Sequence, residues 1–434
     1  MRRVWRNVVS PLVSLVIVMV GSGFFNTYTS LRIAIDGYPS WVIGVLNASY
    51  YLGLMLGSLY IKRLIERIGH IRTFAIFASI NSGVILVQAV FISPVSWTFL
   101  RLLNGFCSSG FFIVIESWLL LSTGVKHRGR LLSLYMLTLY LAQGFGQFLL
   151  NVSPLRSLLP FAMTVFLSSL SVIPVCMMKS SGPLLFESSM TNILHILKKA
   201  PLGLIGCFVA GIIMSSFYGL APIFAKDIGL SVIHISQVMG LTILGGLTLQ
   251  WPIGHLSDVF NRRKVIIFVV VCLMVLTFVL FYSQQFSYSL LLGLMIVFGG
   301  ISFTFYPLSI TLTCDSFAER NIISVTCSLL VVYGTGCIVG PLASSAIMES
   351  IGSSGLFLLM SVLCAIFIVL GMWRVVHCKP FSEEEQSDYL PVPRATSLAF
   401  YLDPHTEIED EELDESDELY PFSEEYDDGD DEDE

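Results

Sequence analysis

Residues 254–264 read GHLSDVFNRRK, and residues 62–72 read KRLIERIGHIR. The two stretches lie 192 residues apart, so that Leu64 corresponds to Leu256 and Glu66 corresponds to Asp258. The further identities at this offset are Gly37 and Gly229, Ile43 and Ile235, Gly53 and Gly245, Arg128 and Arg320, and Gly144 and Gly336. The chain therefore contains two copies of one structural unit, and the basic stretch marks the same position in each copy.

Apolar residues dominate the chain around these stretches. Its 434 residues are 54% hydrophobic and 13% charged, and the mean hydropathy is +0.77. A soluble protein could not bury so much apolar surface, whereas apolar runs of about 20 residues cross a bilayer as helices. Twelve such runs are expected at 11–33, 41–61, 73–93, 97–122, 131–151, 157–178, 202–225, 235–256, 265–284, 287–312, 323–347 and 353–376. Together with the repeat, they predict an all-α membrane protein of twelve transmembrane helices in two pseudo-symmetric halves of six helices.

Breaks in the apolar pattern divide the chain into four parts. The two six-helix halves are expected at 1–178 and 202–376, with a central cytoplasmic loop at 179–201 between them. Within this loop, residues 192–199 predict a short amphipathic helix on the membrane surface. Residues 377–434 form an acidic tail, because the chain has 23 acidic residues and one basic residue from Phe381 onward. Such a composition cannot form a core and predicts a disordered, solvated segment.

The distribution of Lys and Arg predicts the orientation in the membrane. With a cytoplasmic N-terminus, seventeen Lys and Arg residues fall in cytoplasmic loops, and only Arg32, Arg156 and Lys226 fall on the opposite side. Cytoplasmic loops of membrane proteins carry such an excess of positive charge. We therefore expect both termini to be cytoplasmic.

The basic stretch resembles a signature of the major facilitator superfamily, which reads G-x-L-x-D-R-x-G-R-R/K between two helices. The second copy matches at Gly254, Leu256, Asp258, Arg262 and Arg263 and departs at Val259 and Asn261. The first copy matches at Leu64, Arg67 and Gly69, with Glu66 in place of Asp and Lys62 in place of the leading Gly. The resemblance implies a secondary transporter, a multi-pass protein of the bacterial inner membrane.

Four shorter phrases resemble the YcaD-like branch of bacterial transporters in this superfamily. They are Asn26-Thr27, Tyr50-Tyr51-Leu52-Gly53, Gly69-His70-Ile71-Arg72 and Glu116-Ser117-Trp118-Leu119. The resemblance covers about residues 10–376 and leaves out the acidic tail. It sharpens the expected mechanism but does not name a solute.

The charges of the two basic stretches suggest a conformational latch. A carboxylate at the cytoplasmic end of one helix can bind the N-terminus of a neighbouring helix and nearby Arg side chains. Such a cluster would form when the two halves close on the cytoplasmic side and break when they open inward. The expected members are Glu66, Arg67, Gly69, Arg72, Gly254, Asp258, Arg262 and Arg263. The alternative is that these residues are only solvated positive-inside charges.

Two charged residues lie within the fourth predicted span. Arg101 and Gly105 resemble the superfamily pattern R-x-x-x-G, in which the Arg is thought to help move a proton; the alternative is that Arg101 snorkels to the nearby outer surface. Glu116 is the one carboxylate well inside a predicted span, so it is the leading candidate for proton coupling. It could instead form a gate pair with Arg128 or Arg130, and Asp315 with Arg320 would be the matching gate of the second half.

Polar residues in the spans predict a solute site. Asn26 lies within the first span, and its counterpart in the repeat is Tyr218. The first and seventh helices line the cavity in the superfamily fold, so the resemblance makes these two residues the leading substrate contacts. The weaker candidates are Arg32, Gln143, Gln147, Tyr306 and Tyr333. The alternatives are hydrogen bonding between helices and, for Arg32, anchoring of the helix end.

The sequence also argues against several functions. It has no G-x-x-x-x-G-K-[ST] loop for ATP, no H-E-x-x-H motif and no nucleophile elbow, so we expect no enzyme and no cofactor. The cysteines and histidines lack ligand spacing, so we expect no metal and no disulfide. The expected partners are a small solute, protons and the lipid bilayer; we expect no nucleic acid, and a monomer.

We therefore expect a secondary transporter that works by alternating access and is driven by protons. One alternative is a membrane sensor, or transceptor, of the same fold that signals through the acidic tail. Another is a drug or metabolite exporter, although the fifth span lacks the Pro of the run G-x-x-x-G-P-x-x-G-G that many drug antiporters of the superfamily carry.

Overall fold

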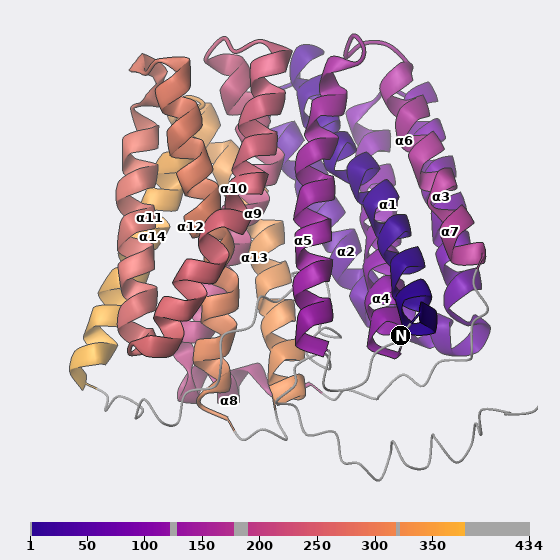
Figure 1. Ribbon diagram of the computed structural model, residues 1–434. Coiled ribbons are helices and arrows are strands. Elements are labelled where there is room, and N and C mark those ends of the chain that lie inside the picture. The colour runs from indigo at the N-terminus through magenta and orange to yellow at the C-terminus, as the bar shows by residue number, and fades with distance from the viewer. Residues whose placement is uncertain (1, 122–127, 178–189, 318–321, 378–434) are drawn as a thin grey trace, which may run out of the picture.

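The computed structural model describes residues 2–121, 128–177, 190–317 and 322–377, and this part of the chain is a bundle of helices with no strand (Figure 1). The first half contains α1 (Arg2–Ile35), α2 (Ser40–Ile68), α3 (His70–Val90), α4 (Pro94–Leu121), α5 (Arg128–Gly146), the 3₁₀ helix η2 (Gln147–Asn151), α6 (Leu159–Leu170) and α7 (Val172–Cys176). The second contains α9 (Pro201–Asp227), α10 (Val232–Val259), α11 (Arg262–Phe281), the 3₁₀ helix η3 (Ser283–Gln285), α12 (Tyr288–Cys314), α13 (Ile322–Ile351) and α14 (Gly355–His377). Between them lies the short helix α8 (Ile193–Lys199), as the sequence predicted.

Eleven segments of the described chain are long and apolar enough to cross a membrane. They are α1 to α4, the α6–α7 pair, and α9 to α14. The remaining predicted span, 131–151, is α5 followed by η2, and α5 runs through the bundle beside its neighbours (Figure 1). Gln143 and Gln147 lie within this span. The prediction of an all-α membrane fold is confirmed.

The sixth predicted span, 157–178, is divided in the structure. Helix α6 ends at Leu170 and α7 begins at Val172, so that Ser171 alone separates them. Pro174 lies four residues after Leu170. A proline lacks the backbone N–H that would bond four residues back, and its ring crowds that carbonyl. The break therefore lies where the proline removes the helical bond.

The basic stretches are helical rather than loops, and in this respect the expectation was wrong. Helix α2 runs on to Ile68, and Gly69, with φ +83°, is the single residue between α2 and α3. Helix α10 runs on to Val259, and α11 begins at Arg262. Charged side chains at these helix ends reach past the apolar region, so the helices need not end where the apolar pattern ends.

The internal repeat is visible in the backbone. Gly37 follows α1 with φ +88°, and its counterpart Gly229 follows α9 with φ +86°. A side chain strains this left-handed backbone, so both copies use glycine at the same turn. In Figure 1 the helices of the first copy occupy one side of the bundle and those of the second copy occupy the other. The chain thus folds as two pseudo-symmetric halves.

The two ends of the bundle differ in the residues that they carry. The basic side carries Gly69, Arg72, Asn261 and Lys264, and it also holds α8; it is the lower end in Figure 1. The opposite side carries the turns at Gly37 and Gly229. Between the halves, α2 packs on α13, α5 and η2 pack on α10, and α1 packs on α9. The two halves therefore meet along three sets of helices.

Candidate functional site

A cavity lies between the two halves. Its walls come from α1, α2, α4 and α5 of the first half and from α9 and α13 of the second half. The free space within it, including the part that opens to solvent, is about 980 Å³. Its polar and aromatic lining residues include Asn26, Tyr50, Tyr51, Gln143, Tyr218 and Tyr333.

The cavity occupies the middle and the basic half of the bundle. Tyr50 lies ten residues into α2 from the opposite side, about 15 Å along the helix axis. From there the α2 wall continues toward the basic side through Leu54 and Ser58. The lining stretch of α13 begins at Leu330, nearer the basic side, and ends at Cys337. The cavity therefore has its blind end near mid-span.

Close contacts between the halves fill the opposite side. Gly44 of α2 touches Ser345 and the backbone of Pro341 on α13 so closely that a side chain at Gly44 would not fit. Asn151 donates a hydrogen bond of 2.8 Å from Nδ2 to Oγ of Ser236. These contacts join the halves above the blind end of the cavity.

The two leading substrate candidates both line the cavity. Asn26 is half-buried on α1, and its side chain makes no hydrogen bond to another described residue. Tyr218 on α9 donates a hydrogen bond of 3.3 Å to Oε1 of Gln143 on α5. This bond crosses between the halves at the cavity wall, and it brings the predicted Gln143 and Tyr218 together.

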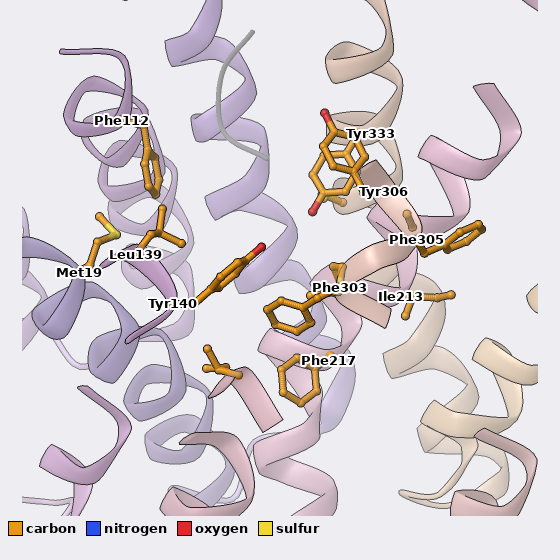
Figure 2. Close-up of a cluster of buried hydrophobic side chains, with 14 of the residues drawn as sticks. Met19, Phe112, Leu139, Tyr140, Ile213, Phe217, Phe303, Phe305, Tyr306 and Tyr333 are labelled. Atoms are coloured by element: carbon orange, nitrogen blue, oxygen red, sulfur yellow. The ribbon is translucent and has the colours of Figure 1, made fainter. Parts of the chain in front are cut away.

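The weaker candidates divide into two groups. Tyr333 lines the cavity, and its ring lies 4.3 Å from that of Tyr306 on α12. In Figure 2 Tyr140 of α5 stands across from this Tyr306–Tyr333 pair. Gln147 is fully buried, and its amide nitrogen donates a hydrogen bond of 2.8 Å to the backbone oxygen of Gly23. This bond joins η2 to α1. Gln147 and Tyr306 are not among the residues that line the cavity.

Arg32 lies at the opposite side, away from the cavity. Its Nε is 2.7 Å from Oδ2 of Asp36, and its Nη1 donates 3.2 Å to the backbone oxygen of Leu155. The contacts fasten the end of α1 to the connection that precedes α6. The anchoring alternative therefore describes the contacts of Arg32 better than a substrate role.

Arg101 is buried beside the cavity and does not snorkel to the surface. Only 1% of its surface is exposed, and its guanidinium carbon lies 4.5 Å from the ring centroid of Tyr50. Nη1 donates a hydrogen bond of 3.1 Å to Oδ1 of Asn104. The amide nitrogen of Asn104 donates a hydrogen bond of 2.5 Å to Oδ1 of Asn81. Nη2 has no hydrogen-bond partner, and no carboxylate pairs with Arg101 among the described residues.

Glu116 is fully buried at the basic end of α4. Its Oε1 accepts a hydrogen bond of 2.6 Å from the hydroxyl of Tyr135 on α5. The next residue, Ser117, lies 2.8 Å from Nε2 of His70 on α3. Helix α5 begins at Arg128, whose side chain lies outside the described residues, as does that of Arg130. The predicted gate pair of Glu116 with either Arg therefore stays a prediction.

Three charged residues of the basic side form one cluster. Nη1 of Arg262 lies 2.7 Å from both carboxylate oxygens of Asp315, and Nη2 lies 3.2 Å from Oδ1 of Asp258. The cluster joins the ends of α10, α11 and α12, and Gly254 is buried one turn before it on α10. Asp315 was expected to pair with Arg320, but Arg320 lies outside the described residues. The observed partner, Arg262, was assigned to the latch instead.

The first-half members of the expected latch are arranged differently. Glu66, Arg67 and Arg72 are exposed, and none of them pairs with a carboxylate or cation within the described chain. Gly69 forms the turn, and its carbonyl accepts a bond of 2.7 Å from Oγ1 of Thr73. In the second half Arg263 is half-buried on α11. The two basic stretches thus occupy equivalent places without forming equivalent contacts.

Three cavity tyrosines were missed by the sequence analysis as site residues, namely Tyr50, Tyr51 and Tyr140. The spacing of residues in the sequence indicated the helix faces on which such tyrosines lie. Tyr51, Met55 and Ser58 recur on α2, and Met136, Tyr140 and Gln143 recur on α5, at spacings of three or four residues. Residues so spaced share one face of a helix. A polar-aromatic face in a membrane helix therefore indicated a cavity wall.

Comparisons with known proteins support this reading of the fold. The family model described as "Major Facilitator Superfamily" matches residues 12–329 and 204–402. An uncharacterized MFS-type transporter of Enterobacter sp. is 27% identical over 372 residues, covering 84% of this chain and 95% of that protein. The uncharacterized MFS-type transporter YcaD of Escherichia fergusonii is 27% identical over 379 residues, covering 86% of this chain and 97% of that protein.

Solved structures show the same fold at low sequence identity. A mutant form of the nucleoside transporter NupG superposes with a TM-score of 0.74 at 14% identity, covering 85% of this chain and 99% of that chain. A bacterial homolog of the human lysosomal transporter Spinster, solved inward-facing and occupied, gives a TM-score of 0.68 at 11% identity, covering 88% of this chain and 97% of that chain. The protein, a multi-pass membrane protein similar to bacterial transporters, belongs to the major facilitator superfamily.

Proposed function

We propose that the protein is a secondary active transporter that moves a small solute by alternating access, with proton coupling. The observation that carries the proposal is the cavity between the halves, which ends at mid-span beneath the contacts of Gly44 and Asn151. A site at the interface of two repeated halves is what alternating access requires, because rocking of the halves exposes it to each side in turn.

In this proposal the basic side is cytoplasmic, and the structure represents an inward-open state. The excess of Lys and Arg on that side supports the orientation. A bacterial inner membrane, two cytoplasmic termini and a monomeric protein complete the proposal. The tight contact between α2 and α13 on the opposite side would have to separate when the site opens outward.

Glu116 is the proposed proton site. Burial in an apolar helix favours the neutral form of a carboxyl group, and the Tyr135 hydroxyl gives Glu116 a hydrogen-bond partner in either protonation state. Movement of α4 against α5 would change this environment and could release the proton. Such a coupling of protonation to conformation is what a proton-driven carrier needs.

A ligand screen tests the function first. The purified protein in detergent is screened by thermal shift against metabolites and drugs at two pH values, beside the Asn26→Ala/Tyr218→Phe variant. We expect a compound that stabilises the wild type and stabilises the variant less, because both altered side chains line the cavity. Counterflow of that compound into proteoliposomes should then be observed. A bound compound that is never moved would contradict the transport proposal.

A further inference from the structure

The cavity lining carries no formal charge. None of its 17 residues is Asp, Glu, Lys, Arg or His, and five of them are tyrosines. An ion that leaves water for such a site loses its hydration without gaining a counter-ion. Rings and apolar side chains, in contrast, pack well against a flat solute. The lining therefore favours a neutral solute with a flat face.

Three polar groups of the lining are available to a solute. The amide of Asn26 and the hydroxyls of Tyr50 and Tyr51 make no hydrogen bond to another described residue, and all three side chains line the cavity. Each of these groups can both donate and accept a hydrogen bond. Hydroxyl and amide groups on a solute are complementary to these three groups, because they too can both donate and accept a hydrogen bond.

Arg101 adds a fixed positive charge behind this wall. It contacts Tyr50, which lines the cavity, while Arg101 itself is not part of the lining. No carboxylate of the described chain neutralises it, and its Nη2 has no hydrogen-bond partner. Tyrosine rings alone would attract an organic cation. The guanidinium already occupies the electron-rich ring of Tyr50 and repels a second cation.

We infer that the solute is uncharged and carries hydroxyl or amide groups on a ring, and that Arg101 is the residue that excludes organic cations. This inference rests on the proposed transport function, because it names the solute class of the same cavity. It predicts the order of binding as neutral, then anionic, then cationic. The anion should bind better than the cation because the positive charge of Arg101 attracts it. It should bind less well than the neutral solute because no charged lining residue donates a hydrogen bond to it.

Matched probes that share one ring test the order. One set is nicotinamide, nicotinate and 1-methylnicotinamide, and a second is benzamide, benzoate and benzyltrimethylammonium, used beside a metabolite library sorted by charge. Binding is measured by thermal shift and by calorimetry on the full chain. We expect neutral probes to bind at least tenfold more tightly than their cationic partners. Asn26→Ala and Tyr51→Phe should weaken the binding of the neutral probes. Equal or tighter binding of cations would overturn the inference, as would a library without any bound neutral compound.

Arg101→Gln tests the origin of the selectivity, with Arg63→Gln as the matched control on the exposed end of α2. The Arg101 variant should bring the cationic probes to within about threefold of the neutral ones, and the control should leave the order unchanged. If Arg101→Gln does not fold, Asn26→Asp serves instead, since it adds an anion to the lining and should reverse the preference toward cations. An unchanged order in the folded Arg101→Gln variant would overturn the role of Arg101, and an unchanged order in Asn26→Asp would overturn selection by charge in this cavity.

Flux separates the two levels of the proposal. A neutral compound that binds in the cavity but is not moved in proteoliposomes would contradict transport while leaving the solute class intact. A cation that is moved by the wild type would support transport and contradict the solute class.

Discussion

Arg262 and Asp315 form a buried bidentate ion pair between α11 and α12, with Nη1 of Arg262 lying 2.7 Å from each carboxylate oxygen. The Arg262 side chain is 1% exposed and the Asp315 side chain is 2% exposed. Asp258 adds a second, longer contact from α10. The cluster therefore holds three helices of one half together at the basic side, whatever contact it makes with the other half.

Replacing Asp315 by Asn should destabilise the protein by about 3–5 kcal/mol, because the change removes the carboxylate closest to the buried Arg262 and leaves it the longer contact with Asp258. Thermal unfolding in detergent, followed by intrinsic fluorescence, measures the effect. The matched control is Asp227→Asn, which breaks a pair with Lys226 whose side chains are both about a third exposed and should cost at most about 1 kcal/mol. Equal effects of the two variants would contradict a structural role for the buried pair.

Asp258→Asn should act more on conformation than on stability. The Asp258 side chain is 31% exposed, and its contact with Arg262 is long, so its loss should shift the balance of states by roughly two- to fivefold. The cluster is formed in the state proposed as inward-open, so it does not form only on closure of the basic side. If it nevertheless favours that closure, the variant should populate longer distances on the basic side. Genetically encoded spin-label amino acids at Arg63 and Val259 report this distance and leave the native cysteines in place.

Asn151→Ala provides the counterpart to that experiment. It removes the bond of Asn151 to Ser236 on the opposite side, and should therefore lengthen distances between labels at Tyr38 and Ile233. The latch hypothesis would be wrong if Asp258→Asn left the distance distribution on the basic side unchanged.

The fold was predictable because its signals are long and redundant. Apolar runs and the paired glycines Gly37 and Gly229 predicted the spans and the repeat, and the structure confirms the turns. The breaks and ends of individual helices were harder to predict. The division at Ser171 depends on a single proline, and the ends of α2 and α10 depend on charged side chains that reach past the apolar region.

The site was only partly predictable, since hydropathy does not say which face of a helix meets a cavity. The repeat paired Asn26 with Tyr218, and the resemblance to the superfamily predicted that both line the cavity, whereas Tyr50 and Tyr51 were not predicted as lining residues. The partner of Asp315 could not be read from sequence either. Arg262 and Arg320 both follow helix ends in the sequence, and only the three-dimensional packing places Arg262 against the Asp315 carboxylate.

Tyr218→Phe should weaken the contact between halves while keeping the ring in place. The variant loses the hydrogen bond to Oε1 of Gln143, worth about 0.5–1.5 kcal/mol, so the outward-open population should rise roughly two- to tenfold. The labels at Tyr38 and Ile233 measure this shift. Tyr288→Phe is the control, because its hydroxyl bonds Gln237 within the second half and should not change the population.

Glu116→Gln should flatten the pH dependence of flux. The wild type can exchange a proton at Glu116, whereas the amide is neutral at every pH, so the variant should move solute with no pH-driven accumulation. Counterflow, which needs no proton gradient, should survive. Tyr135→Phe keeps the carboxyl group, and should shift the pH profile without abolishing it. Unchanged pH dependence in Glu116→Gln would assign coupling to another group.

Deletion of residues 381–434 separates a transporter from a sensor. This segment holds 23 of the 32 acidic residues and follows α14 in the sequence, while every residue that lines the cavity lies before it. A transporter should therefore keep the flux of its solute, within about twofold, after the deletion. A sensor that signals through the tail should still bind its ligand with unchanged affinity but lose its cellular output. Flux, ligand affinity and cellular output are therefore measured on the same truncated chain. Retained flux supports the transporter, and lost output with unchanged affinity supports the sensor. A fall in flux with intact binding would show that the acidic segment takes part in transport itself.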